Sequence, residues 1–225
     1  MNRQPDVITI DGPGGAGKGT IARAIAERLG FHLLDSGAIY RLLALASLQQ
    51  KIALDDQPRL VSLAESLAVE FPINGPHAGD VVLDGQVVSQ AIRAECCGSR
   101  ASELATSPAI RQALLDRQRS FLQPPGLVAD GRDMGTVVFT QAKVKIFLTA
   151  SVEERAQRRH KQLMEQGVSA SLTDLLEDMQ IRDERDQQRA TAPLKPADDA
   201  IIIDTTSMDV ELVVKTVMER VEHAA

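Results

Sequence analysis

The sequence predicts an α/β fold in which helices cover both faces of a parallel sheet. Short runs that are apolar throughout alternate with stretches of helical periodicity, which is typical of parallel strands buried on both faces. The chain has 225 residues, of which 44% are hydrophobic and 25% are charged. This composition is ordinary for a globular protein and argues against a disordered chain, a collagen-like chain and a coiled coil.

The expected strands and helices alternate along most of the chain. Strands are expected at 7–10, 31–34, 127–129, 144–148 and 200–203, and helices at 18–29, 36–50, 107–122, 151–166, 171–189 and 208–222. One stretch breaks the alternation, because Asp84-Gly85 separates two short apolar runs and indicates a hairpin. With the apolar segment at 67–71, it predicts a small antiparallel sheet inserted at about 65–90.

Composition also bears on location and partners. No apolar run approaches the ~20 residues of a membrane-spanning helix, and the run at 7–10 is shorter than the ~7–15 residues of a signal-peptide core. Cys96 and Cys97 are adjacent and join no distant segments. The net charge of −6 and the 3% of aromatic residues argue against binding to a nucleic-acid polymer. We therefore expect a cytoplasmic protein with reduced thiols, no membrane or nucleic-acid partner, and a monomer as the default state.

A glycine-rich loop between the first strand and the first helix has the spacing of a P-loop. Its residues are Gly12, Pro13, Gly14, Gly15, Ala16, Gly17, Lys18, Gly19 and Thr20. Glycines let backbone N–H groups point at phosphate oxygens, and the lysine reaches the β- and γ-phosphates. Gly19 stands where the general pattern has Ser or Thr, so Thr20 is the candidate hydroxyl for Mg²⁺, with Asp130 as a candidate partner through water. A P-loop indicates a bound nucleotide phosphate without separating GTPases, ATPases and small-molecule kinases.

Charged residues gather where other predicted strands end. Asp11, Asp35 and Asp130 each lie at such an end, and ligands of open α/β sheets bind beyond the carboxyl ends of the strands. The run from Asp130 to Gly135 is not explained by packing, so we interpret it as functional. Ser36 is placed to cap the next helix. Arginines recur at helical spacing in 151–189, which fits either a solvated, ion-paired face or a lid that closes over a transferring phosphoryl group.

Together these segments resemble the bacterial cytidylate kinases, a family of P-loop nucleoside monophosphate kinases. The resemblance extends along nearly the whole chain and rests on the segments 12–20, 33–41, 130–136, 182–189 and 192–194. The loop alone would also fit adenylate kinases, whereas the other segments and the insertion at 65–90 are specific to the cytidylate branch. The order Lys18-Gly19-Thr20 departs from the general P-loop pattern and matches the loop of this family.

The resemblance implies a P-loop NTPase fold with a five-stranded parallel core. It implies one kinase domain over 1–225, with a core at 1–35, 98–152 and 190–225, a monophosphate-binding subdomain at 36–97, and a helical lid at about 153–189. It also implies a reaction in which MgATP and CMP or dCMP give ADP and CDP or dCDP.

The resemblance assigns roles to individual positions. It gives phosphoryl transfer to Lys18, Arg155, Arg158, Arg159 and Arg182. It places the phosphate of the acceptor and its surroundings at Ser36, Tyr40, Arg41, Arg132 and Arg189, the cytosine at Ser102, Arg111 and Asp133, and the sugar at Asp186.

The hydrogen-bonding groups of cytosine agree with the residues assigned to the base, and two alternative functions remain. Asp133 can accept from the exocyclic amine of cytosine, whereas uracil has a carbonyl there, so we expect Asp133 to disfavour UMP. The acceptor phosphate is already anionic, so in-line attack requires neither a phosphoenzyme nor a general base. One alternative is the same fold with another acceptor, such as UMP, AMP, shikimate or dephospho-coenzyme A. The other is a regulatory module that binds ATP without transferring phosphate.

Overall fold

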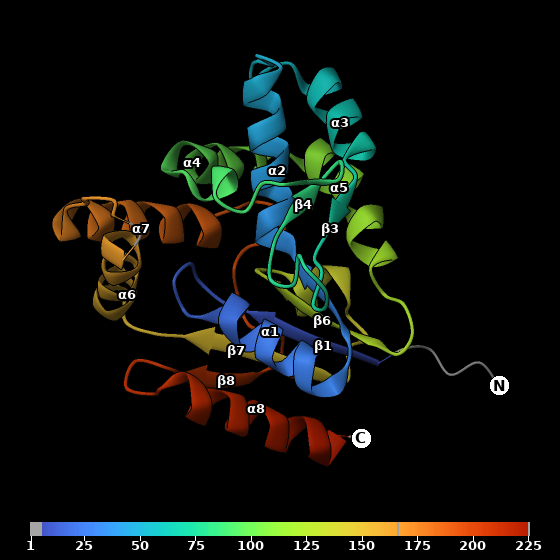
Figure 1. Cartoon of the computed structure of the whole chain (residues 1–225), viewed down its shortest axis with the longest axis vertical. Helices are drawn as coiled ribbons and strands as arrows, with labels where there is room; N and C mark the ends of the chain where they lie inside the picture. Colours follow the sequence, from blue (N-terminus) through green and yellow to red (C-terminus); the bar gives the residue numbers. More distant parts are fainter. Residues whose placement is uncertain (1–5, 166, 225) are drawn as a thin grey trace.

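A five-stranded parallel sheet forms the centre of the molecule (Figure 1). The computed structural model describes residues 6–165 and 167–224. The strands lie in the order β2-β6-β1-β7-β8. Their bounds are Asp6–Asp11 for β1, His32–Asp35 for β2, Gly126–Gly131 for β6, Val144–Thr149 for β7 and Ile201–Asp204 for β8. The predicted α/β fold with a five-stranded parallel core is confirmed.

Both faces of the sheet are covered. In β1 the consecutive residues Ile8, Thr9 and Ile10 are all buried, and because side chains alternate along a strand, neither face of β1 is open to solvent. Helices α1 (Lys18–Leu29) and α8 (Val210–Ala224) pack side by side along the sheet (Figure 1). The short π-helix η2 (Met134–Val138) packs against β1 and β6.

The helices outside this core form two groups. The first comprises α2 (Ser36–Gln49), α3 (Gln57–Ser66), α4 (Glu95–Leu104) and α5 (Pro108–Ser120), with the 3₁₀ turn η1 (Ala91–Arg93). In the second, α6 (Val152–Glu165) packs against α7 (Leu172–Gln187), which reaches back toward α2 and α4 (Figure 1). None of the described helices is long and apolar enough to cross a membrane.

The expected insertion is an antiparallel sheet of three short strands. Its strands are β3 (Val69–Glu70), β4 (Val82–Leu83) and β5 (Gln86–Val87), in that order. Asp84 and Gly85 join β4 to β5 with φ values of 50° and 76°, the positive values that a tight hairpin turn of matching twist requires. The predicted hairpin is confirmed.

Two local expectations are corrected, and helices α3 and α4 lie in stretches where the sequence predicts no helix. Strand β6 continues through Asp130 and Gly131 because both pair with β1, so Asp130 belongs to the strand rather than following it. The cap of α2 is Asp35, whose carboxylate accepts from the Ala38 N–H at 2.8 Å, and not Ser36.

Candidate active site

The P-loop joins β1 to α1 with a backbone that needs glycine. Gly12 has φ +149°, and a Cβ there would lie 2.0 Å from the Leu148 carbonyl oxygen. Gly17, with φ 86°, precedes the first turn of α1 and carries no side chain to cap it. The first N–H groups of α1 therefore face the loop without a side-chain partner from the cap, which suits an anion.

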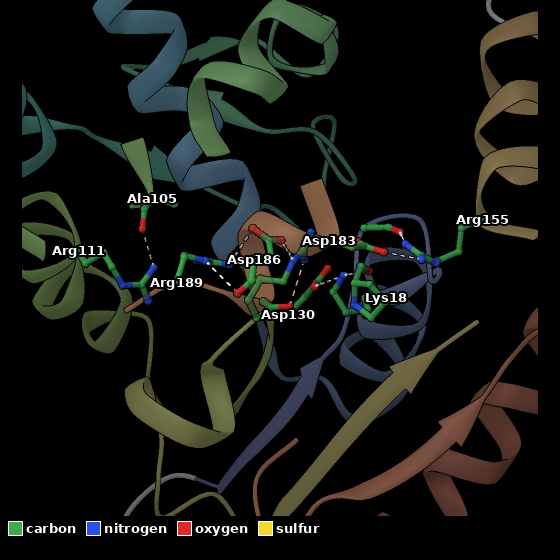
Figure 2. Close-up of polar contacts among 12 residues, drawn as sticks. Lys18, Ala105, Arg111, Asp130, Arg155, Asp183, Asp186 and Arg189 are labelled. Atoms are coloured by element: carbon green, nitrogen blue, oxygen red, sulfur yellow. Dashed lines mark hydrogen bonds and ion pairs between the residues drawn. The ribbon is translucent and has the colours of Figure 1, made fainter. Parts of the chain in front are cut away.

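Lys18 turns toward the loop and the neighbouring strand (Figure 2). Its Nζ donates to the Pro13 carbonyl oxygen at 3.0 Å and lies 3.8 Å from Asp130 Oδ1. Burial, followed by repulsion from Arg132, lowers the pKa of Lys18 to about 8, although Asp130 opposes the shift. Burial also raises the pKa of Asp130 to about 7 against the attraction of Lys18. The attraction between Lys18 and Asp130 thus offsets only part of the cost of burying both charges.

A cavity lies beside this pair, between α2, α4, α5, β6 and α7. It brings together every residue predicted for the acceptor except Arg41: Ser36, Tyr40, Ser102, Arg111, Arg132, Asp133, Asp186 and Arg189, with Arg182 at the same wall. The Arg41 Nη1 instead donates to the Ile92 carbonyl oxygen at 2.9 Å. Residues from five elements far apart in the chain therefore face one space.

Carboxylates neutralise the arginines of this cavity. Asp186 accepts from Arg132 Nε at 2.9 Å and lies 2.9 Å from Arg189 Nη2 (Figure 2). Burial alone would raise the pKa of Asp186, but Arg132 and then Arg189 outweigh it and hold the pKa below its ordinary value. Asp133 is paired with Arg111, yet burial dominates and raises the pKa of Asp133.

One of the residues predicted to read the base has a buried hydroxyl without a hydrogen-bond partner among the described residues. Ser102 is buried, lines the cavity, and its Oγ has no hydrogen-bond partner among the described residues. A buried hydroxyl without a partner costs about 1–3 kcal/mol, so the site gains when a ligand supplies one. Arg111, also predicted to read the base, stacks over the Tyr40 ring at 5.9 Å from its centroid.

Gln118 supports the site from behind Ser36, and sequence reasoning missed it. Its Oε1 accepts from the Ser36 hydroxyl at 2.7 Å, while its Nε2 donates to the Leu114 carbonyl oxygen at 3.2 Å. A carbonyl only accepts, so the orientation of the Gln118 amide is fixed. Ser36 and Gln118 are separated by 82 positions, and no local signal links them.

The predicted transfer arginines take different positions around the P-loop. Arg155 is buried and donates to the Gly14 carbonyl oxygen at 2.9 Å and to Asp183 at 2.5 Å. Arg158 and Arg159 line a second cavity that also contains Gly15, Gly17 and Thr20. Arg155 thus ties both helices of the expected lid to the loop.

The residues proposed for Mg²⁺ offer oxygen donors on either side of the loop. Thr20 is exposed on the first turn of α1, and Asp130 Oδ2 would lie 3.4 Å from a Cβ placed on Gly19. No group of three or more His, Cys, Asp or Glu side chains in the described part of the chain could hold a metal ion alone. This arrangement fits Mg²⁺, which binds through one or two protein oxygens, substrate phosphates and water.

Lys18 of the P-loop lies next to the arginine-lined cavity between α2, α4, α5, β6 and α7. This pair of sites defines a P-loop kinase, in which the P-loop holds the phosphate donor and the cavity holds the acceptor. Comparison with known families is more specific. The family model described as cytidylate kinase matches residues 8–223. The chain belongs to the cytidylate kinase family and is a nucleoside monophosphate kinase.

Individual relatives agree along the whole chain. The cytidylate kinase of Aeromonas salmonicida is 54% identical over 99% of this chain and 96% of its own length. That of Pseudomonas aeruginosa is 54% identical over 99% of this chain and 98% of its own length. A solved shikimate kinase from Bacteroides thetaiotaomicron overlaps with a TM-score of 0.47 at 12% identity, a likeness too loose to support an argument.

Proposed function

We propose that the protein transfers the γ-phosphoryl group of MgATP to CMP or dCMP, giving ADP and CDP or dCDP. The contact between Lys18 and Asp130 carries this proposal. Lys18 belongs to the P-loop, and Asp130 begins the segment that holds Arg132 and Asp133 in the acceptor cavity. The donor and acceptor sites therefore meet at adjacent strand ends, which places two nucleotides close enough for direct transfer.

The acceptor cavity has the donors and acceptors that cytosine requires. Asp133 accepts from the exocyclic amine, and Arg111 and Ser102 donate to the ring nitrogen and the carbonyl. With UMP, the Asp133 carboxylate would face the uracil carbonyl, and neither oxygen could donate a hydrogen bond to the other. The unpaired acceptors would weaken binding by about 1–3 kcal/mol. Asp133→Ala should therefore lower the ratio of kcat/KM for CMP over UMP about tenfold. An unchanged ratio in a folded variant would remove Asp133 from this role.

The charged side chains of the acceptor cavity can bind a phosphate and a sugar. Arg132 and Arg189 are held by Asp186 in the free protein, and an arriving phosphate provides them with a second anionic partner. Asp186 keeps acceptor capacity for a sugar hydroxyl. Arg41 would have to leave the Ile92 carbonyl to contact the same phosphate.

Transfer itself needs little covalent chemistry from the protein. Lys18, the P-loop amides and Arg182 neutralise charge that spreads over the transferring group, and Arg155, Arg158 and Arg159 do so from the lid. A bound Mg²⁺ would neutralise phosphate charge and orient the phosphates, with Thr20 and, through water, Asp130 holding it. Closure of the lid over these groups excludes water, which would otherwise hydrolyse ATP.

We extend the proposal to the domain division and to the setting of the enzyme. The core, the monophosphate-binding subdomain and the lid are assigned to the ranges expected from the resemblance, with α6 and α7 as the lid. The net charge of −6 supports a protein that binds no nucleic-acid polymer. We assign it to the cytoplasm as a monomer without membrane association, and light scattering of the pure protein tests the monomer.

Transfer of label tests the proposed reaction. ATP labelled on its γ-phosphate should give CDP labelled on the β-phosphate. When the reaction is stopped during turnover, the protein itself should carry no label. Labelled protein would contradict direct transfer, and label only in inorganic phosphate would contradict kinase activity. Lys18→Ala provides the matched inactive control.

A further inference from the structure

The carboxylate of Asp11 bonds to η2, which directly follows the acceptor residues Arg132 and Asp133, rather than to the P-loop that it precedes. Its Oδ1 accepts from the Met134 N–H at 2.8 Å, and its Oδ2 accepts from the Gly135 N–H at 2.8 Å. Asp11 is buried at the end of β1, next to Gly12 of the P-loop. The Asp11 side chain thus links β1, which leads into the P-loop, to η2, which follows the acceptor residues Arg132 and Asp133.

These two N–H groups are the first of η2, and the residue before them is Asp133. Asp133 has φ −145° and ψ 23°, outside both the helical and the extended regions, so it marks an abrupt turn from β6 into η2. The bonds to Asp11 fix where η2 starts, and thereby where the Asp133 carboxylate meets Arg111.

The absence of a side chain at position 135 is part of the same contact. A Cβ on Gly135 would lie 2.9 Å from Thr9 Oγ1 and 3.4 Å from Asp11 Oδ2. Thr9 is fully buried, so a methyl group at position 135 would have little room unless the Thr9 side chain or η2 shifted. Glycine at position 135 therefore lets the backbone of η2 approach Asp11 without such a shift.

We propose that Asp11 is a positioning residue for the acceptor base: by holding the start of η2, it sets the position of Asp133 and hence the preference for CMP over UMP. This inference rests on the proposed function, because it assumes that Asp133 reads the base. It adds a residue that lies outside the acceptor cavity and acts through two backbone hydrogen bonds. Hydrogen bonds to a charged acceptor are among the stronger ones in proteins.

Asp11→Asn tests the inference, with Asp6→Asn as the matched control. The two residues lie on the same strand, but Asp6 is exposed to solvent at its far end and pairs with Lys143 at 2.9 Å. In Asp11→Asn, one of the two oxygens becomes an NH₂ group that faces a backbone N–H. We expect the KM for CMP to rise and the CMP/UMP ratio of kcat/KM to fall roughly tenfold, since one charge-assisted bond is lost. The KM for ATP should change little, and Asp6→Asn should behave as the wild type.

Gly135→Ala provides a second route if Asp11→Asn fails to fold. It leaves Asp11 intact and pushes η2 away from β1, so it should lower the same ratio. A folded variant of either kind that keeps the wild-type ratio overturns the inference, as does a change confined to the KM for ATP. If the wild type does not phosphorylate CMP, the proposed function itself fails, and the variants are not needed to show it.

Discussion

Asp186 is the shared counter-ion of two largely buried arginines, Arg132 and Arg189, and its removal should be costly. Its carboxylate lies 2.9 Å from Arg132 Nε and 2.9 Å from Arg189 Nη2, whose side chains are 17% and 5% exposed. Asp186→Asn keeps the shape of the side chain and removes the charge. Two largely buried guanidinium groups are then left without their shared counter-ion. Breaking a buried pair in this way costs about 3–5 kcal/mol.

This cost predicts a measurable loss of thermal stability. In a chain of this size, 1 kcal/mol shifts the melting temperature by about 2–4 °C, so Asp186→Asn should melt roughly 6–20 °C below the wild type. Differential scanning calorimetry without ligands measures the shift. Asp6→Asn is the control, because Asp6 pairs with Lys143 at 2.9 Å where the two side chains are 41% and 46% exposed, and its loss should leave the melting temperature nearly unchanged.

Anions should partly reverse the loss. Inorganic phosphate can take the place of the missing carboxylate between Arg132 and Arg189, and a ligand that binds only the folded state raises its stability. Phosphate should therefore raise the melting temperature of Asp186→Asn more than that of the wild type. A loss below about 2 °C, or equal stabilisation of both proteins by phosphate, would refute the account of the free site.

Three further predictions concern the P-loop lysine, the buried amide and pH. Lys18→Ala should remain folded and lose at least about a hundredfold in kcat, because a charge aimed at the transferring group is removed; near-normal turnover of a folded variant contradicts this. Gln118→Leu should raise the KM for CMP and leave that for ATP unchanged, because Ser36 loses the acceptor that orients it; equal KM values for CMP in the two proteins would argue otherwise. Asp130, whose pKa is raised to about 7, binds its proton more tightly when folded. The free energy of unfolding of the wild type should therefore fall relative to Asp130→Asn as pH rises from about 4 to about 7, and parallel curves in chemical denaturation would show that the shift is absent.

Much of the fold follows from local sequence, because its signals are local. Helix α1 begins at Lys18 and ends at Leu29 as predicted, since glycines flank an apolar face. Helix α3 also had start signals, with Asp56 accepting from the Arg59 N–H and Pro58 in the first turn. These signals do not predict a helix by themselves, because the two buried residues of α3, Leu60 and Ala64, form only a short apolar stripe.

The parts of the site that escaped prediction depend on contacts between distant segments. The bonds from Asp11 to η2 span 123 and 124 positions, and a π-helix with no pattern of its own forms there. Arg41 matches the expected motif, but its guanidinium donates to the Ile92 carbonyl oxygen instead of lining the acceptor cavity. Sequence patterns identify the residue types of a site more readily than the hydrogen-bond partners of those residues, because distant partners come together only in the tertiary structure.

ADP release from MgATP, measured side by side with CMP, dCMP, UMP, AMP and no acceptor, tests most directly whether the cavity is the acceptor site. If Asp133, Arg111 and Ser102 read the base, release is fast with CMP and dCMP, slow with UMP and AMP, and almost absent without an acceptor. Fast release with UMP or AMP would contradict the assignment of the base pocket. Release independent of any acceptor, or none at all despite ATP binding, would contradict the assignment of the cavity as an acceptor site.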